Sequence, residues 1–491
     1  MLPVASAVPR IGGPYTPRVS AVRGYIEGVS GSAFDSLLLL AALAVLGAAG
    51  LLLLVHLPRT AVAVYVAALG WAPIWFGGNL SYFYIPVHTV LALTAIAALL
   101  RHPGPPLRLT AVDGVLLGVC ALILLEYPLG LTEVALPAQL VIEWLPALAV
   151  GRIAWVRVGQ RFLGGTFLVV FGIAGALAVL EGLTGMNLWV SFVALPNAAF
   201  RAWGALQFRA GALRAEGAMG HSIALGCSLA MAVPMLLAAR TKAWLRLLAA
   251  LLVLAGGVAT LSRLGMVLPL VGLAAMLLFN RRDLGRGLRA VLGVLLLAAG
   301  AAASWMQSTV FAAAGSEATN SAAYRLWLLS LVPSLEPLGQ ASSFQRSSDK
   351  TASFGAFASI DSQVLDLALK VGWVPVAILL ALLLLAAARV VLRRADPATT
   401  ALVVQFPAFL TVAFITQYGM VVWFFAGMAA GAYAVARHQT ASDTSSETAN
   451  PAPPGPGNQH TDVMEPSRDL LPAAQRPPAA PTRKEGRNDA N

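Results

Sequence analysis

Long apolar runs alternate with short polar connections along most of the chain. Each run covers about 17–22 residues, the length that a helix needs to cross the hydrocarbon core of a bilayer. A membrane β-barrel would instead show short segments in which apolar and polar residues alternate. The pattern therefore predicts an all-α, polytopic integral membrane protein with about 12–13 transmembrane helices. The candidate spans are residues 35–56, 60–78, 82–100, 111–127, 134–151, 162–182, 219–239, 243–261, 263–280, 287–305, 363–392, 400–417 and 419–437.

Two polar segments interrupt this pattern, at residues 183–218 and 306–361. We interpret both as external loops of a transmembrane domain that covers residues 33–437. Within the second loop, residues 321–329 place apolar side chains at helical spacing around Arg325. This spacing predicts a short amphipathic helix that lies on the membrane surface, either as a lipid anchor or as part of a site.

Both ends of the chain differ from this domain in composition. Residues 1–32 lack the compact charged-then-apolar layout of a cleaved signal peptide, so we expect a disordered leader. Residues 438–491 are rich in proline, serine and asparagine, and they offer little apolar surface to repay the entropy of ordering. They predict a disordered cytoplasmic tail.

Arginines and lysines in the short connections indicate the orientation. Four connections carry these charges, near residues 152–161, 240–246, 281–289 and 393–394, and they share one side when the spans alternate. The positive-inside rule makes that side cytoplasmic. Both long loops then lie outside and the C-terminus inside. The N-terminus lies outside for thirteen spans or inside for twelve.

Composition excludes several classes of protein. Hydrophobic residues make up 58% of the chain and charged residues 11%, too few to cover a soluble globule of 491 residues. The net charge of +11 is explained by the positive-inside bias of the loops, so it does not predict nucleic-acid binding. Cys120 and Cys227 lie inside apolar runs and form no metal or disulfide motif. The sequence also lacks the motifs of nucleotide-driven pumps, HExxH metalloenzymes and serine hydrolases. We expect no metal and no cofactor.

Arg263 is the most distinctive charged residue. It follows residues 260–262 between two apolar runs, with almost no loop to keep it in water. An arginine at membrane depth on the outer side is either a functional residue or a side chain that snorkels to lipid phosphates.

The segment at residues 214–221 leads into the seventh predicted span and holds Arg214, Glu216 and His221. If the segment is helical throughout, Arg214 and His221 share a face, although two glycines oppose that continuity. His221 is a candidate general base or hydrogen-bond donor to phosphate, with a satisfied histidine inside the bundle as the alternative.

Asp361 precedes the eleventh predicted span. The nearby Asp366 and Lys370 stand four residues apart and can pair on one helix face, whereas Asp361 has no such local partner. Outward arginines beside an apolar bundle suit an anionic diphosphate on a long lipid. Guanidinium groups can stabilise charge on a departing diphosphate, and a nearby carboxylate or imidazole can take a proton from a sugar hydroxyl.

Four segments, in this order, resemble the O-antigen ligase and polymerase superfamily of bacterial membrane glycosyltransferases. They are residues 214–234 (RAEGAMGHSIALGCSLAMAVP), 260–265 (TLSRLG), 324–339 (YRLWLLSLVPSLEPLG) and 361–372 (DSQVLDLALKVG). The similarity covers roughly residues 160–435. Ligases carry a histidine where this chain has Asp361 and Ser362, and the Asp-Asn of polymerase-like members is closer to this sequence.

The resemblance implies a metal-independent, inverting glycosyltransferase at the outer face of a bacterial cytoplasmic membrane. Its donor would be an oligosaccharide on undecaprenyl diphosphate, its acceptor a glycan or lipid, and its other partners membrane lipids and polysaccharide-assembly proteins. Arg263, Arg325 and Arg214 would bind the diphosphate. Asp361, or alternatively His221 or Glu216, would activate the acceptor hydroxyl.

Two other functions fit the same pattern of spans. A transporter, such as a flippase of lipid-linked oligosaccharide, would place its charges along a path near the bilayer midplane. Here the candidate residues gather at the outer end, which favours an enzyme. A scaffold that binds partners through its tail would lose its function when residues beyond about 440 are deleted.

Overall fold

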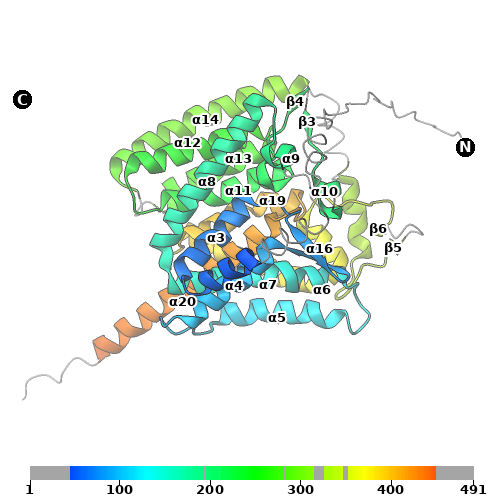
Figure 1. Ribbon diagram of the computed structural model, residues 1–491, viewed down its shortest axis with the longest axis horizontal. Coiled ribbons are helices and arrows are strands. Elements are labelled where there is room, and N and C mark those ends of the chain that lie inside the picture. Colours follow the sequence, from blue (N-terminus) through cyan, green and yellow to red (C-terminus); the bar gives the residue numbers. More distant parts are fainter. Residues whose placement is uncertain are drawn as a thin grey trace, which may run out of the picture. The chain divides into compact units, whose positions relative to one another are not determined.

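The computed structural model describes residues 45–192, 195, 197–209, 211–280, 284–313, 324, 326–346 and 352–448. Over these ranges the chain is mostly helical (Figure 1). Five helical segments are long and apolar enough to cross a membrane: Ala135–Arg157, Gly159–Thr184, Arg286–Ser304, Trp373–Val391 and Tyr418–Gln439. In this coarse form, a mostly helical chain with several membrane-length helices, the predicted fold class is confirmed.

The element labels follow Figure 1. The long helices are α8 (Gly159–Thr184), α14 (Arg286–Ala313), α17 (Trp373–Val391) and α20 (Tyr418–Thr448), together with the continuous run of α6 (Ala135–Gln139), a π-helical turn η1 (Leu140–Trp144) and α7 (Leu145–Arg157). Shorter helices are α3 (Pro58–Trp71), α4 (Val87–Arg101), α5 (Ala111–Glu126), α9 (Leu188–Phe192), α10 (Ala198–Trp203), α11 (Ser222–Leu237), α12 (Ala243–Ala259), α13 (Arg263–Phe279), α16 (Gln363–Val371), α18 (Pro397–Val404) and α19 (Phe406–Thr411). A further apolar helix covers Val45–Val55.

Short antiparallel hairpins occur in the connections. They are β1 (Gly77–Leu80) with β2 (Phe83–Pro86), β3 (Phe208–Arg209) with β4 (Ala212–Leu213), and β5 (Phe344–Arg346) with β6 (Ala352–Phe354). Two 3-10 turns, η2 (Gly217–Met219) and η4 (Leu329–Ser334), lie in the two long polar segments. The helices up to Gln439 belong to one compact unit.

Helix α11 lies at the centre of this unit. All of its residues except Ile223 are buried, and it packs against α8, α12, α13 and α18. Glycines allow the helices around it to approach closely. A Cβ atom on Gly226 of α11 would lie 2.4 Å from the Cα atom of Gly265 in α13. A Cβ atom on Gly175 of α8 would lie 2.5 Å from the carbonyl oxygen of Leu252 in α12. Small residues at such crossings are typical of helices that pack in membranes.

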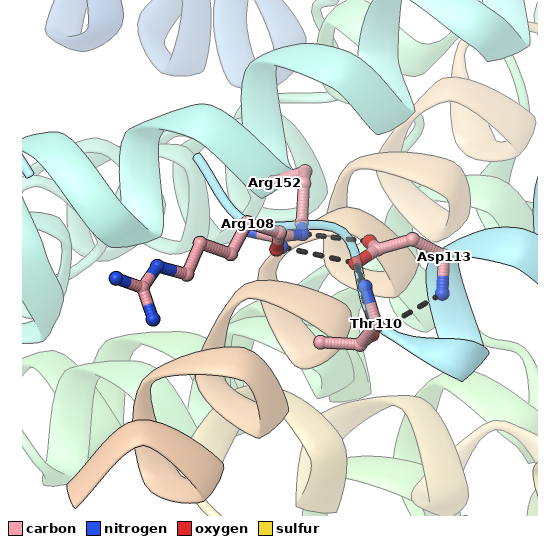
Figure 2. Close-up of polar contacts among 4 residues, drawn as sticks. All are labelled: Arg108, Thr110, Asp113 and Arg152. Carbon is pink, nitrogen blue, oxygen red and sulfur yellow. Dashed lines mark hydrogen bonds and ion pairs between the residues drawn. The ribbon is translucent and has the colours of Figure 1, made fainter. Parts of the chain in front are cut away.

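Helix α5 is fastened to α7 by an ion pair at its N-terminus (Figure 2). Arg152 donates from Nε to Oδ1 of Asp113 at 2.7 Å and from Nη2 to Oδ2 at 3.0 Å. Arg152 Nη2 also donates to the carbonyl oxygen of Arg108, at 2.7 Å. Thr110 and Asp113 cap α5 reciprocally through a capping box. The prediction that Arg152 lies in a short connection is therefore wrong, because this side chain belongs to α7 and joins two helices.

Two predicted spans are interrupted in the structure. Residues 363–392 form α16 and α17 rather than one helix, because Gly372 between them adopts a left-handed φ of +81°. A side chain at Gly372 would also collide with the carbonyl oxygen of Pro337, 2.5 Å from its Cβ position. Residues 400–417 form the end of α18 and all of α19, and the helix stops at Thr411. Pro407 cannot donate a backbone hydrogen bond, which is consistent with the break between α18 and α19.

Candidate functional site

A buried carboxylate organises the end of the bundle where α8 finishes. Glu181, near the end of α8, accepts a hydrogen bond from the backbone N–H group of Gly217 at 2.8 Å and from that of Glu216 at 3.0 Å. The side-chain amide of Asn187 also donates to it, at 2.8 Å. The two backbone donors hold the segment around residues 214–221 against α8, and Asn187 adds a third hydrogen bond to the same carboxylate. We call Glu181, Asn187, Gln207, Arg214 and Glu216 the polar cluster.

Glu216 is completely buried within this cluster. Its Oε1 atom accepts the backbone N–H group of Gln207 at 2.9 Å, and the side chain of Gln207 in turn accepts from the hydroxyl of Ser222 at 3.1 Å. The pKa of Glu216 is raised to about 7, mainly by burial and also by the nearby charge of Glu181, while the Gln207 hydrogen bond and the charge of Arg214 oppose the rise. Glu216 is thus poised to exchange a proton near neutral pH, but it lies beneath the surface.

Two arginines, Arg209 and Arg214, donate hydrogen bonds to the turn at residues 260–262, between α12 and α13. Arg214 donates from Nε to the carbonyl oxygen of Thr260 at 3.3 Å, and Arg209 donates from Nη1 to that of Leu261 at 2.7 Å. These carbonyls close the C-terminal end of α12, where the helix dipole favours positive charge. Both arginines therefore stabilise the turn that leads directly into Arg263.

The turn itself is strained. Leu261 has a left-handed φ of +45°, which is uncommon for a residue other than glycine. The hydroxyl of Thr260 accepts the N–H group of Ser262 at 3.2 Å, and Ser262 then caps α13. Strain of this kind persists only where surrounding contacts hold it, and it often occurs at functional sites.

Arg263 is the first residue of α13, and its side chain is exposed. A cation at a helix N-terminus opposes the helix dipole, which costs about 0.3–1 kcal/mol when no anion is bound. The same position lets the guanidinium and the first N–H groups of the helix act together on an anion.

The structure brings three predicted site residues together, Arg214, Glu216 and His221, but not on a continuous helix. Gly217 and Gly220 have positive φ angles of 53° and 60°, so the chain turns through η2 and α11 starts only at Ser222. The charge of Arg214 still acts on both Glu216 and His221. Residues 214–221 thus form a compact turn, so the condition under which Arg214 and His221 would share a helix face is not met, as the two glycines indicated.

His221 caps α11 with its ring. Its Nδ1 atom accepts the N–H group of Ile223 at 3.2 Å, and its ring packs edge-on to Trp203 at 6.4 Å between centroids. Because Nδ1 is an acceptor, the neutral ring carries its proton on Nε2. The half-buried imidazole therefore presents a hydrogen-bond donor on its other side.

Asp361 lies two residues before α16, on an exposed bend. Burial raises the pKa of Tyr324, and the charge of the Asp361 carboxylate also raises it. The hydroxyl of Tyr324 also donates to the carbonyl oxygen of Ser359. Arg325 itself lies outside the described residues. The predicted pair of Asp366 and Lys370 is confirmed, with 2.8 Å between Oδ2 and Nζ.

Residues 412–417 connect the start of α16 with the segment at residues 214–221. At one end, the N–H group of Gln363 donates to the carbonyl oxygen of Val412, and Gln363 Oε1 accepts the N–H group of Phe414. At the other end, Gln417 Nε2 donates to the carbonyl oxygen of Ala218 at 3.0 Å. Three extended residues span at most about 11 Å, so Phe414 and Gln417 keep the start of α16 close to residues 214–221.

An apolar cavity of about 520 Å³ begins beside Gln363. It follows α17 from Val376 to Leu392, about 24 Å at 1.5 Å per helical residue. Side chains of α5, η1, α16, α18, α19 and α20 also line it, as do Phe414, Arg389 and Tyr433. The cavity is shaped for an extended apolar chain.

The sequence did not point to Glu181. It is a single acid at the end of an apolar run, and the backbone groups that it binds lie 35 and 36 residues later. The only feature of the sequence that could have indicated a role for Glu181 is its position next to a long polar segment. Among the described residues, no three His, Cys, Asp or Glu side chains come together as a set that could hold a metal ion.

Comparison with known proteins identifies no relative of this chain. The sequence matches no protein-family model, no curated protein and no solved structure.

Proposed function

We propose that this chain is a membrane glycosyltransferase of the O-antigen ligase and polymerase superfamily. It transfers glycan from an undecaprenyl-diphosphate-linked donor to a hydroxyl acceptor at the outer face of a bacterial cytoplasmic membrane. One observation carries the proposal: Arg209, Arg214 and Arg263 gather around the turn at residues 260–262, and residues 412–417 link residues 214–221 to Gln363, two residues after Asp361.

The arginines suit the diphosphate of the donor. Arg263 reaches the ligand directly, together with the N-terminus of α13, and the half-buried His221 can donate from Nε2 to a phosphate oxygen. Arg209 and Arg214 are engaged with carbonyl groups of the turn, so they position Arg263 and add positive potential. As the glycosidic bond breaks, these groups stabilise the charge that develops on the leaving diphosphate.

Asp361 suits the acceptor. The oxygen of an acceptor hydroxyl attacks the anomeric carbon of the donor sugar, and the bond from that carbon to the diphosphate oxygen breaks. The Asp361 carboxylate takes the hydroxyl proton, and the lipid diphosphate leaves with the electron pair. A single displacement of this kind inverts the configuration at the anomeric carbon. Asp361 is exposed, as a group that meets an incoming acceptor must be.

Glu216 has a different role in this proposal. Its side chain is completely buried and holds the N–H group of Gln207, so it shapes the segment that carries Arg214 and His221. We therefore assign Glu216 as a positioning residue and Asp361 as the proton acceptor.

The apolar cavity beside α17 supports a polyprenyl donor. It starts at Gln363, two residues from Asp361, and its length of about 24 Å approaches the thickness of the hydrocarbon core, about 30 Å. A lipid chain in this cavity would place its diphosphate at the end of the bundle that carries Asp361.

Contacts between connections support the orientation. Two predicted external connections touch, through Arg346 and Glu133 at 2.9 Å, and through the N–H group of Gln340 and the carbonyl oxygen of Leu131 at 2.8 Å. Two predicted cytoplasmic connections also touch, since Asn280 donates to the carbonyl oxygen of Ala395 at 3.2 Å. If the spans alternate in direction, connections that touch must lie on the same side of the membrane, and both contacts agree with this requirement.

The test is transfer by the purified full chain in nanodiscs, with a polyprenyl-diphosphate-linked oligosaccharide and no nucleotide. We expect longer glycans or glycosylated acceptor, with activity at least 100-fold lower in Arg263→Ala. Arg240→Ala is the matched control, because Arg240 is an exposed arginine of a predicted cytoplasmic connection, and it should keep normal activity. Equal activity of the two variants would contradict the assignment of Arg263.

Two further readouts separate the alternatives. Movement of the intact donor across a vesicle membrane, with no new glycosidic bond, would indicate a flippase instead. Deletion of residues 440–491 should leave transfer unchanged, and loss of transfer in that protein would favour the scaffold.

A further inference from the structure

A second cavity lies between α3 and α8, away from the polar cluster. Its volume is about 830 Å³, and its lining includes Ala63, Val64, Phe162, Gly165 and Val169. Apolar side chains form most of this wall, and the arginines Arg59 and Arg161 also line the cavity.

The two helices meet at one end of this cavity and separate toward the other. At the closed end, the indole N–H group of Trp71 donates to the carbonyl oxygen of Val170 at 2.9 Å. A Cβ atom on Gly70 would lie 2.8 Å from a methyl group of Val170. A Cβ atom on Gly165 would meet nothing within 4 Å, so the helices leave open space there.

The length of the cavity matches one leaflet of a bilayer. Arg59 and Trp71 are twelve residues apart on α3, which corresponds to about 18 Å along a helix. Half of a hydrocarbon core is about 15 Å thick. A cavity of this length accommodates one acyl chain whose headgroup remains at the membrane surface.

Arg59 and Arg161 both lie at helix N-termini, where the helix dipole already produces a positive potential. Arg59 lies in the first turn of α3 and Arg161 in the first turn of α8, and neither first turn contains an acidic residue. No side chain caps the N-terminus of either helix. Within the described part of the chain, neither exposed guanidinium makes a hydrogen bond or an ion pair. Two cations at two uncapped helix N-termini are unfavourable together unless an anion binds there.

We propose that this cavity binds one anionic glycerophospholipid, with its phosphate between Arg59 and Arg161 and one acyl chain between α3 and α8. Charge complementarity selects an anionic headgroup, because the zwitterionic phosphatidylcholine would bring its own cation close to both arginines. The site is independent of the proposed glycosyl transfer, since it shares no residue with the polar cluster or with Asp361.

Native mass spectrometry of the full chain in detergent tests this proposal, with titrations of phosphatidylglycerol and of phosphatidylcholine. We expect one tightly retained phosphatidylglycerol and at least tenfold weaker binding of phosphatidylcholine. The double variant Arg59→Gln with Arg161→Gln should lose the preference for phosphatidylglycerol. Arg240→Gln, which removes an exposed arginine that does not line the cavity, should keep it.

A second variant tests the acyl-chain part of the cavity without removing charge. Gly165→Phe fills open space on α8 and should lower the retention of phosphatidylglycerol at least tenfold, with an unchanged melting temperature. Equal binding of both lipids by the native chain would overturn the proposal. So would wild-type retention of phosphatidylglycerol by the double variant or by Gly165→Phe, because the lipid would then bind elsewhere.

Discussion

Glu181 binds the backbone N–H group of Glu216 at 3.0 Å, while its carboxylate charge acts on the side chain of the same residue. One acid thus fixes the position of a second and also makes it harder to ionise. Since Glu216 follows Arg214 by two residues, this relationship reaches the turn that leads to Arg263.

Replacing Glu181 by glutamine should destabilise the protein by about 2–3 kcal/mol. The amide group would turn an NH2 toward one of the two backbone donors that Glu181 now accepts, which leaves a buried N–H group unpaired. Thermal unfolding in detergent measures this loss. Glu133→Gln is the control, because Glu133 forms a partly exposed ion pair with Arg346, and its loss should cost under about 1 kcal/mol. Similar melting temperatures of the two variants would contradict the structural role of Glu181.

Because of Glu216, we expect the free energy of unfolding to fall as the pH rises from about 4.5 to about 7. Burial raises the pKa of Glu216 to about 7 from its ordinary 4.5, so the folded protein holds this proton more tightly than the unfolded chain does. At about 1.4 kcal/mol per pH unit, the loss of unfolding free energy approaches about 3.5 kcal/mol.

Melting temperatures of the native chain and of Glu216→Gln, measured from pH 4.5 to pH 8, check this prediction. Burial also raises the pKa of Asp396, which lowers the stability of both proteins as the pH rises, so the difference between them reports Glu216 together with Glu181, whose charge acts on it. Parallel curves would show that Glu216 does not titrate in this range.

We expect a large loss of unfolding free energy when one partner of the ion pair between Arg152 and Asp113 is replaced. Both side chains are mostly buried, at 12% and 7% exposure, so Arg152→Ala leaves an uncompensated carboxylate and should cost about 3–5 kcal/mol. The double variant Asp113→Asn with Arg152→Gln should recover part of that loss, because it leaves no buried charge. Lys370→Ala, which breaks a more exposed pair within one helix, should cost under about 1 kcal/mol in the same unfolding assay.

The variant Asp361→Asn tests whether Asp361 takes the proton of the acceptor without contributing to binding of the lipid-linked donor. If Asp361 takes the acceptor proton, its amide should lower kcat at least about 100-fold and leave the affinity for the lipid-linked donor unchanged. Asp366→Asn, on the adjacent helix and paired with Lys370, should change kcat little. Single-turnover transfer and donor binding are measured on the same preparations. A wild-type kcat in Asp361→Asn would remove this residue from the mechanism.

The sequence predicted well those features that depend on local pattern. Many of the apolar runs form helices, several of them of membrane length, and Asp366 and Lys370, four residues apart on one helix, form an ion pair. The predicted positions of helix ends were less accurate, because they depend on single backbone angles. Gly372 could have continued a helix, but its φ of +81° separates α16 from α17, where Pro337 packs against it.

The candidate site was only partly predictable for a similar reason. Arg214, Glu216 and His221 are close in the sequence and could be selected together. Glu181 acts on backbone N–H groups 35 and 36 residues away, and backbone groups carry no sequence signal. The role of Arg209 also depends on a carbonyl oxygen, that of Leu261, 52 residues away.

The amide of Gln417 has a consequence for how the protein is made. It donates to the carbonyl oxygens of Ala72 and Ala218, which lie 345 and 199 residues earlier in the chain. At about 5–20 residues per second, a ribosome needs roughly 17–70 s to travel from Ala72 to Gln417. The carbonyl group of Ala72 needs another partner throughout that interval, and that of Ala218 for roughly the last 10–40 s of it, before Gln417 is made.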